Sequence, residues 1–259
     1  MKAVVFHEYG GIDKLKYEEA PDPKLQHGDV LVRVKAAALN HIDIWGRMGG
    51  VPLPHISGSD IAGEVVELGG GVTEFDIGAK VVVFPATSCG KCESCLLDRP
   101  TQCKHRQLIG FQIDGGYAEY VKVSAENLFF IPSNLSFEEA AALPLAGSTA
   151  WHMLVSKGRV DPTSIVLIHG AGSGVSTYAI QLAKVFGAKI IATTSSKEKI
   201  AKALNLGADH AVNYREKDVA EEVKKLTDGR GVDIVIDHVG AATFDTSLKS
   251  LRRGGKLVS

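Results

Sequence analysis

The sequence predicts an α/β protein in which a mostly-β first half precedes a doubly wound parallel sheet. Two observations lead to this prediction. Short runs rich in β-branched residues, separated by Gly, Pro and Asp, dominate residues 1–136. From residue 137 onward, apolar strands alternate with helical patterns, as in a parallel sheet with crossover helices.

The first half contains five predicted strands. Each is a short apolar or alternating run bounded by turn residues. The runs are AVVFHEY (3–9), DVLVRVKAAAL (29–39), IAGEVVEL (61–68), AKVVVF (79–84) and YAEYVKV (117–123). They predict a strand-rich domain over residues 1–136.

An Ala-rich stretch, FEEAAALPLAGSTAWHMLVS (137–156), predicts a helical segment. Ser136 is a suitable N-cap before two glutamates. Pro144 and Gly147 are expected to interrupt the helix. We therefore place the start of the second domain at residue 137.

The rest of the chain alternates between the two element types. Predicted strands cover 164–169, 189–193, 210–212, 232–236 and 256–258, and predicted helices cover 175–186, 197–206, 218–226 and 243–251. A doubly wound sheet usually has a sixth strand, so we expect this chain to be part of a longer protein.

Composition narrows the function classes. The 259 residues carry a formal net charge of -1, which gives no electrostatic basis for binding nucleic acid or an anionic membrane. No apolar run is long enough to span a bilayer, and the N-terminus lacks the apolar core of a signal peptide. We expect a cytoplasmic protein that acts on a small molecule.

The only four cysteines lie together, in the run CGKCESCLLDRPTQC. Two-residue gaps let thiolates converge on one ion, and the longer gap lets the chain return to complete a tetrahedron. Two disulfides or four free thiols are the alternatives. The spacing predicts one structural zinc in a lobe at about 86–106, closed to substrate, with ligands Cys89, Cys92, Cys95 and Cys103.

A glycine-rich turn in IVLIHGAGSGVSTYAIQLAK joins a predicted strand to a predicted helix. Such a turn brings the backbone close to a pyrophosphate at a helix N-terminus, although a plain strand-to-helix turn is the alternative. The context favours a Rossmann dinucleotide-binding domain over 137–259. Its predicted cofactor contacts are Gly170, Gly172, Ser173, Gly174 and Val175.

The next strand ends without an acidic residue, in ATTSSKEK. Sites that favour NAD place an Asp or Glu there for the ribose hydroxyls. Hydroxyl groups and a lysine instead suit a 2′-phosphate, which favours NADPH over NADH. The residues concerned are Thr194, Ser195, Ser196 and Lys199. In the alternative interpretation, Ser196 only caps the next helix and the lysines are solvated.

Together, these features resemble the medium-chain dehydrogenase/reductase family, which includes zinc alcohol dehydrogenases and quinone oxidoreductases. The resemblance extends over the whole chain and includes VKAAALNHID, GSDIAGEVVELGGGV, the cysteine lobe and GGYAEYV. It implies an N-terminal GroES-like domain, an NAD(P)-dependent oxidoreductase activity and a homodimer or homotetramer.

Alcohol dehydrogenases of this family hold a second, catalytic zinc. The resemblance aligns its ligand positions with Asn40, Ser59 and Leu145, which are poor zinc ligands. It therefore implies the quinone oxidoreductase-like branch, with the structural zinc retained and the catalytic zinc absent. An alternative ligand set by residue type is His41, Asp43, His55 and Asp60, although a lone histidine is more often hydrogen-bonded within the protein.

Without a Lewis acid, alcohol oxidation loses the group that stabilises an alkoxide, whereas a conjugated acceptor spreads the charge itself. We therefore predict NADPH-dependent reduction of a quinone, enone or alkenal. The catalytic candidates are Asn40, Asp43 and Thr149. An equal alternative is that Asp43 and Asp60 only stabilise the fold. The resemblance places Thr149 near the nicotinamide, and Val239 in a stretch (237–240) whose backbone follows the cofactor.

Two other functions stay open at this stage. One is a zinc-dependent alcohol dehydrogenase with unusual catalytic ligands. The other is a cofactor-binding protein with a structural or regulatory role and little turnover. Trp45 stands where some alcohol dehydrogenases have a histidine proton relay, and is read either as a pocket wall or as core.

Overall fold

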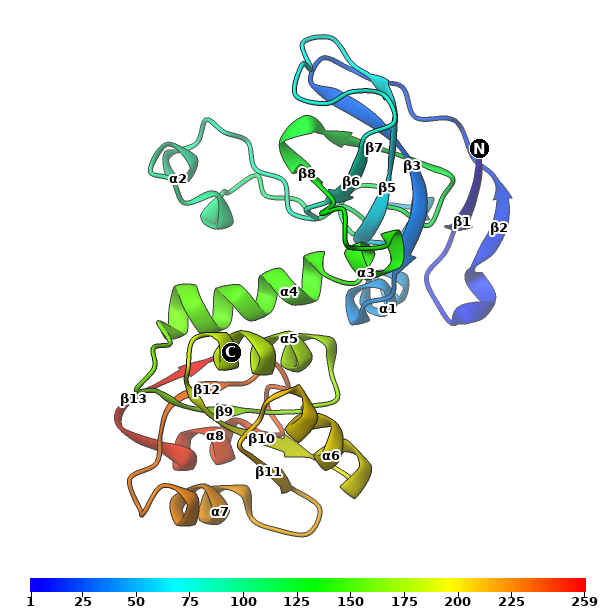
Figure 1. Cartoon of the computed structure of the whole chain (residues 1–259). Helices are drawn as coiled ribbons and strands as arrows, with labels where there is room; N and C mark the ends of the chain where they lie inside the picture. The colour runs from blue at the N-terminus through cyan, green and yellow to red at the C-terminus, as the bar shows by residue number, and fades with distance from the viewer. The chain divides into compact units, whose positions relative to one another are not determined.

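The computed structural model describes residues 1–259 and contains two compact units, Met1–Leu145 and Ala146–Ser259 (Figure 1). The first is mostly β and the second is α/β, so the predicted fold class is confirmed. None of the helices combines the length and apolar character needed to cross a membrane.

The first unit is built on a five-stranded antiparallel sheet with the order β7-β3-β5-β6-β8. Alternate side chains of its strands, such as Val30, Val32 and Ile61, point into one apolar core because successive side chains of a strand face opposite ways. The strands are β3 (Asp29–Ala38), β5 (Asp60–Leu68), β6 (Lys80–Val83), β7 (Tyr120–Ser124) and β8 (Leu128–Phe130).

A smaller antiparallel sheet, β2-β1-β4, completes the β structure of this unit. It consists of β1 (Lys2–Phe6), β2 (Lys16–Glu19) and β4 (His55–Ile56). Sequence analysis missed β2, β4 and β8, because the first is polar and the others have two or three residues. Short helices join the strands: η1 (Ile12–Lys14), α1 (His41–Met48), α2 (Glu93–Leu96), η2 (Pro100–Gln102) and η3 (Ala125–Asn127).

The boundary between the units follows Leu145, whereas the sequence placed it after residue 136. The helix α3 (Phe137–Ala141) begins at the predicted cap Ser136, whose hydroxyl accepts a hydrogen bond from the Glu139 N–H. Ala140 and Ala141 of α3 pack against Ala62 of β5. These tertiary contacts attach α3 to the first unit.

The helical segment after α3 differs from expectation at one of two positions. Pro144 starts the new helix α4 (Pro144–Trp151), as its fixed φ allows at a first helical position. Gly147 lies inside α4 and does not interrupt it, so that expectation was wrong. A π-helical segment, η4 (His152–Gly158), continues the helix, and Ala150 and Leu154 are fully buried in the core of the second unit. Packing here outweighs the low helix propensity of glycine.

The second unit holds a five-stranded parallel sheet with the order β11-β10-β9-β12-β13. The chain reverses its direction of winding between β9 and β12, where ligands bind in folds of this kind. The elements are β9 (Ile165–Ile168), α5 (Gly174–Val185), β10 (Lys189–Thr194), α6 (Lys197–Leu206), β11 (His210–Asn213), α7 (Val219–Leu226), β12 (Val232–Ile236), α8 (Phe244–Ser250) and β13 (Leu251–Val258).

Both faces of this parallel sheet are covered. Val166 and Ile168 of β9 belong to one core with α4, η4, α5 and α6, whereas Leu167 belongs to another with α7. The strands therefore read as continuous apolar runs, which is typical of buried parallel strands. This core fixes the strand ends that carry the candidate cofactor site.

Candidate cofactor and metal sites

The predicted glycine turn joins β9 to α5. Gly170 has a φ of +64°, a left-handed conformation that favours glycine. The N–H of Ala171 donates to the Thr193 carbonyl at 2.8 Å, which holds the turn against β10. Ser173 is the N-cap of α5, and its hydroxyl accepts a hydrogen bond from the Ser176 N–H at 3.1 Å.

Three backbone N–H groups of this turn and of the first residues of α5 donate to no atom of the chain: those of Gly172, Gly174 and Val175. They lie at the N-terminus of a 12-residue helix, where the helix dipole also favours negative charge. The turn is therefore suited to a phosphate-bearing ligand, and a pyrophosphate matches this set of donors.

Lys199, on α6, extends toward the same turn. A Cβ atom placed on Gly172 would lie 3.5 Å from Cδ and 3.6 Å from Nζ of Lys199. The ammonium group therefore lies beside the glycine turn rather than projecting freely into solvent. A cation beside unpaired N–H donors is an arrangement that favours an anion.

At the end of β10, the three predicted hydroxyl residues have different surroundings. Thr194 is buried, and its Oγ1 bonds with the N–H and the carbonyl of Ser196 at 3.2 Å, so this hydroxyl stabilises the turn. The Ser196 hydroxyl accepts the Lys199 N–H at 3.3 Å as the N-cap of α6. Ser195 and Ser196 remain partly exposed. No carboxylate occurs between Thr193 and Lys197.

The loop after β12 is organised by Asp237, which is almost fully buried. Its Oδ1 accepts the N–H groups of Val239 and Gly240 at 3.0 and 3.1 Å and the Thr243 hydroxyl at 2.7 Å. Burial opposes ionisation, but hydrogen bonds from Ser247 and from this loop hold the pKa of Asp237 below its ordinary value. The carboxylate thereby fixes the loop and leaves Val239 half exposed.

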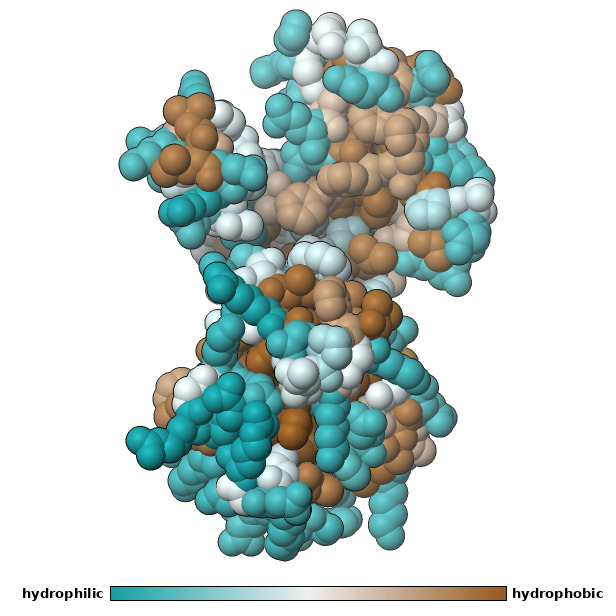
Figure 2. All heavy atoms as spheres, turned by 60° about the vertical axis from the view of Figure 1, so that its left-hand side comes forward, coloured by the Kyte–Doolittle hydropathy of each residue, from teal (hydrophilic) through white to brown (hydrophobic).

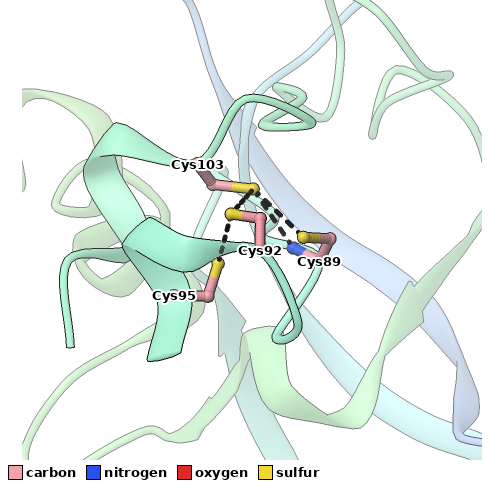
Figure 3. A group of neighbouring side chains, drawn as sticks. All are labelled: Cys89, Cys92, Cys95 and Cys103. Atoms are coloured by element: carbon pink, nitrogen blue, oxygen red, sulfur yellow. Dashed lines mark hydrogen bonds between the residues drawn. The ribbon is translucent and has the colours of Figure 1, made fainter. Parts of the chain in front are cut away.

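The four cysteine sulfur atoms converge, as Figure 3 shows. Sγ of Cys92 lies 3.5 Å from that of Cys95 and 3.8 Å from that of Cys103, and Cys103 lies 3.5 Å from Cys89. Thiolates at about 2.3 Å from a tetrahedral zinc are about 3.8 Å apart. These distances fit four ligands of one ion, and they are too long for sulfur–sulfur bonds of about 2.05 Å.

The thiols of this group ionise unequally. The backbone N–H of Cys95 lowers the pKa of Cys92 to about 6, whereas burial and a hydrogen bond with Cys92 raise the pKa of Cys95 to about 11. Thiolates this close repel one another, so full ionisation needs a cation among them. The donor set thus fits a divalent metal, and zinc is the ion that four thiolates favour.

The lobe that carries the cysteines has little other structure. It holds only the short helices α2 and η2, and it projects from the sheet of the first unit (Figure 1). Its base is closed by the Thr87 N–H, which donates to the Gln107 carbonyl at 2.9 Å. Leu96 and Leu97 are exposed there, and Figure 2 shows apolar atoms on this projection. In a lobe with so little core, an ion bound by the four cysteines would be a main source of stability.

The residues that the resemblance aligns with catalytic zinc ligands have side chains of a different kind from the cysteine quartet. Asn40 Nδ2 donates to Asp60 Oδ2 at 2.8 Å, and the Leu145 N–H donates to Asp60 Oδ1 at 2.7 Å. Asp60 is 2% exposed, and burial raises its pKa against the effect of these two donors. The Ser59 hydroxyl is buried without a partner. The positions that the resemblance aligns with catalytic zinc ligands thus hold an amide, a hydroxyl and an aliphatic side chain.

Asp43 is enclosed by donors. Its Oδ2 accepts the Asn40 N–H and the Tyr117 hydroxyl, each at 2.7 Å, and its Oδ1 accepts the Gly58 N–H at 3.3 Å. Burial, followed by the hydrogen bond to Asp43, raises the pKa of Tyr117. These contacts join α1 to two loops, so the geometry supports the fold-holding interpretation of Asp43.

The alternative ligand set does not come together. His55 is buried, with Nε2 at 3.1 Å from the Gly110 carbonyl and Nδ1 at 3.3 Å from Asp114. His41 is exposed, with its ring centre 6.4 Å from that of Trp45. The cysteine quartet is the one group of three or more His, Cys, Asp or Glu side chains that could hold a metal. Trp45 is 63% exposed, so it is not a core residue.

Thr149, the remaining catalytic candidate, lies in α4 and is partly buried. Sequence reasoning missed three polar residues that support these sites: Tyr117, His169 and Ser247. Tyr117 is visible in the sequence only as part of the run GGYAEYV, and nothing near Ser247 in the sequence relates it to the glycine turn. Their contacts span up to 78 positions, which local patterns do not report.

Family comparisons agree with this architecture. Residues 26–133 match the family described as "Alcohol dehydrogenase GroES-like domain", and residues 174–259 match "Zinc-binding dehydrogenase". An alcohol dehydrogenase from Geobacillus stearothermophilus is 38% identical over all of this chain and 77% of its own length. An acryloyl-coenzyme A reductase from Sulfurisphaera tokodaii is 36% identical over all of this chain and 76% of its own length.

Solved structures extend the likeness to three dimensions. An NAD-dependent alcohol dehydrogenase superposes with a TM-score of 0.96 at 47% identity, covering 99% of this chain and 76% of that one. A quinone oxidoreductase from Pseudomonas syringae pv. tomato DC3000 has a TM-score of 0.84 at 35% identity, covering 99% and 72%. Both alcohol dehydrogenases and quinone oxidoreductases are therefore relatives.

Proposed function

The chain belongs to the superfamily of zinc-type alcohol dehydrogenases and quinone oxidoreductases and is an NAD(P)-dependent oxidoreductase, and we propose that it uses NADPH to reduce a conjugated carbonyl compound without a catalytic metal. The observation that carries this proposal is the replacement of metal ligands by Asn40, Ser59 and Leu145. Asn40 is held by Asp60, so its amide is a fixed polar group.

The reaction class follows from what these groups can stabilise. A bound reduced nicotinamide supplies a hydride, and the electron pair it brings must end on the acceptor. In a quinone, enone or alkenal, hydride addition at the conjugated carbon moves a π pair onto oxygen, and a proton from solvent completes the reduction. Hydrogen-bond donors suffice for such a delocalised oxyanion, whereas an alcohol's alkoxide needs stronger stabilisation.

A conjugated thioester is a further acceptor of the same class. The relative from Sulfurisphaera tokodaii is named for acryloyl-coenzyme A, in which a C=C bond is conjugated to a thioester carbonyl. Alkenoyl thioesters therefore belong in the substrate panel beside quinones, enones and alkenals.

The cofactor proposal depends on two features of the second unit. The unpaired N–H groups of Gly172, Gly174 and Val175 would hold the pyrophosphate. The absence of an acid over residues 193–197, together with Lys199 beside Gly172, favours the 2′-phosphate of NADPH. Ser195 and Ser196 would add hydroxyl contacts.

In the first unit, Cys89, Cys92, Cys95 and Cys103 would hold one zinc ion. Four thiolates fill its coordination sphere, so it supplies structural stability and no substrate site. We expect close to one zinc per chain by elemental analysis.

The central experiment assays quinones, enones, alkenals, alkenoyl thioesters and alcohols, each with NADPH and with NADH. We expect turnover of conjugated acceptors with NADPH and little alcohol oxidation. Efficient alcohol oxidation together with two zinc ions per chain would instead identify a zinc alcohol dehydrogenase. That second candidate is favoured by the name of the Geobacillus relative. Tight NADPH binding without turnover of any acceptor would contradict an enzymatic role.

Cofactor choice has its own test. Lys199→Ala should weaken NADPH binding about tenfold and NADH binding less than about twofold, because only NADPH carries the 2′-phosphate. Lys202→Ala is a matched control, since Lys202 lies on the same helix and pairs with Glu198 at 2.7 Å. An equal loss of affinity for NADPH and for NADH would remove the argument for NADPH.

A further inference from the structure

His169 is a buried histidine at the end of β9, with both ring nitrogens hydrogen-bonded inside the second unit. It is 2% exposed. Its Nδ1 lies 3.3 Å from the Thr193 hydroxyl, and its Nε2 lies 3.0 Å from the Ser247 hydroxyl. Its carbonyl accepts the Ser176 hydroxyl at 2.6 Å. The residue thus contacts β10, α5 and α8.

The proton positions in this chain of contacts can be assigned from one end. Asp237 is ionised and only accepts, so the Ser247 hydroxyl donates to its Oδ2 at 2.7 Å. The oxygen of Ser247 is then left to accept, and His169 Nε2 carries the proton. Burial lowers the pKa of His169, partly opposed by Asp237, so Nδ1 is unprotonated and accepts from Thr193.

The other end of the chain reaches the glycine turn. The Thr193 hydroxyl accepts the Gly170 N–H at 3.1 Å, while Asp237 Oδ1 accepts the N–H groups of Val239 and Gly240. Every hydrogen bond from Gly170 to Asp237 therefore has one allowed direction. The imidazole of His169 is thus one of two that connect the glycine turn with the loop after β12, since Nε2 of His238 in that loop also lies 2.8 Å from the Ser173 hydroxyl.

We infer that His169, as the Nε2–H tautomer, is a positioning residue that sets the loop after β12 relative to the glycine turn and so aligns the nicotinamide half of the cofactor. This inference rests on the proposed use of a nicotinamide cofactor. The order β10-β9-β12 places the ribose-facing end of β10 on one side of the glycine turn and the β12 loop on the other. The half of a bound cofactor beyond the pyrophosphate would therefore extend toward β12.

Two variants interrupt the connection at different points. Ser247→Ala removes the group between His169 and Asp237. His169→Asn keeps a polar group at the δ position facing Thr193 but has no atom that reaches Ser247. Ser250→Ala is the matched control, because Ser250 is also a buried serine of α8 but its hydroxyl donates only to the Thr246 carbonyl.

The test compares two ligands, NADPH and 2′-phospho-ADP-ribose, which lacks only the nicotinamide. Ser247→Ala and His169→Asn should each raise the Kd of NADPH about tenfold and change that of 2′-phospho-ADP-ribose less than about twofold. The double variant should lose no more than either single variant, because both break one connection. Ser250→Ala should leave both affinities unchanged.

A merely structural role predicts another pattern. His169 does not position the cofactor if the variants lower the affinity for both ligands equally, or if Ser250→Ala shows the same selective loss. The same conclusion follows if the losses of NADPH affinity in the two single variants add in the double variant. The same measurements are repeated with NADH and ADP-ribose, in case the protein uses NADH instead of NADPH. The selective loss of affinity for the nicotinamide-containing ligand should appear with whichever pair the wild type binds. A wild-type chain that binds no nicotinamide cofactor would contradict both the inference and the proposed function.

Discussion

Two places in the first unit, both of which the family resemblance aligns with metal positions, differ in their side chains. At the first, four sulfur atoms lie within 4.8 Å of one another and form a complete donor set. At the second, Asn40, Ser59 and Leu145 stand where the resemblance expects ligands, and Asp60 bonds to the Asn40 amide and the Leu145 N–H. The comparison teaches that a structural and a catalytic metal position are independent, because each depends on its own local donors.

The physical settings of the two places differ as well. The cysteine lobe has two very short helices and exposed leucines, so it has little apolar core to stabilise it without an ion. The Asn40 position begins α1 beside the core-packed strand β5, where hydrogen bonds and packing hold the chain without a metal. We therefore expect the first place to need an ion for its stability and the second place to be stable without one.

The largest expected effect comes from Cys92→Ser. Removing one thiolate should lower zinc content well below one per chain and lower Tm by roughly 5–10 °C, because the lobe loses its main stabilising contact. Calorimetry and elemental analysis check this. Ser94→Ala in the same lobe should change neither quantity. Unchanged Tm with lost activity would show that the quartet serves chemistry instead of structure.

Asn40→Ala is the next test in size. It leaves one oxygen of the buried Asp60 without its side-chain donor, and we expect a loss of about 1–3 kcal/mol in the free energy of unfolding. Urea denaturation measures it, with the exposed neighbour Leu39→Ala as control. If stability does not change while zinc content falls, Asn40 belongs to a metal site and the comparison fails.

Asp60→Asn should act mainly on pH dependence. Burial raises the pKa of Asp60 in the folded state above its unfolded value, so the folded protein binds that proton more tightly. Wild-type stability should therefore fall as pH rises from the unfolded pKa, about 3.9, through the raised one. The variant should lack this part of the slope. If acidification lowered the stability of the wild type more steeply than that of the variant, the sign would be opposite to this prediction.

The smallest expected effect comes from Ser59→Ala. Its buried hydroxyl has no partner, so removing it should leave stability unchanged or raise it by up to about 1 kcal/mol. Ser57→Ala, which removes a second unpartnered buried hydroxyl, should behave alike. A loss above about 1 kcal/mol for Ser59→Ala alone would mean that the hydroxyl has a bound partner, such as a metal or an ordered water.

Much of the second unit could be predicted from the sequence because its strands are continuous apolar runs separated by capped helices. The predicted bounds of α6 and β12 coincide with those observed. The last strand, β13, begins at Leu251 rather than 256, because Leu251 pairs with Val232 of β12 before a register shift, and pairing resumes at Lys256. In the first unit, β2 forms through pairing with β1 despite its polar sequence.

The sequence by itself determined the chemistry available to this protein: four cysteines at zinc-binding spacing, a glycine turn before a helix, and no thiolate or imidazole at positions 40, 59 and 145. Local spacing suffices for these features, since their residues are close along the chain. Tertiary structure alone decided which polar groups meet. Asn40 with Asp60, Tyr117 with Asp43, and His169 with Ser247 are pairs separated by 20, 74 and 78 positions. Strand order and helix packing bring them together, and sequence periodicity contains no information on such contacts.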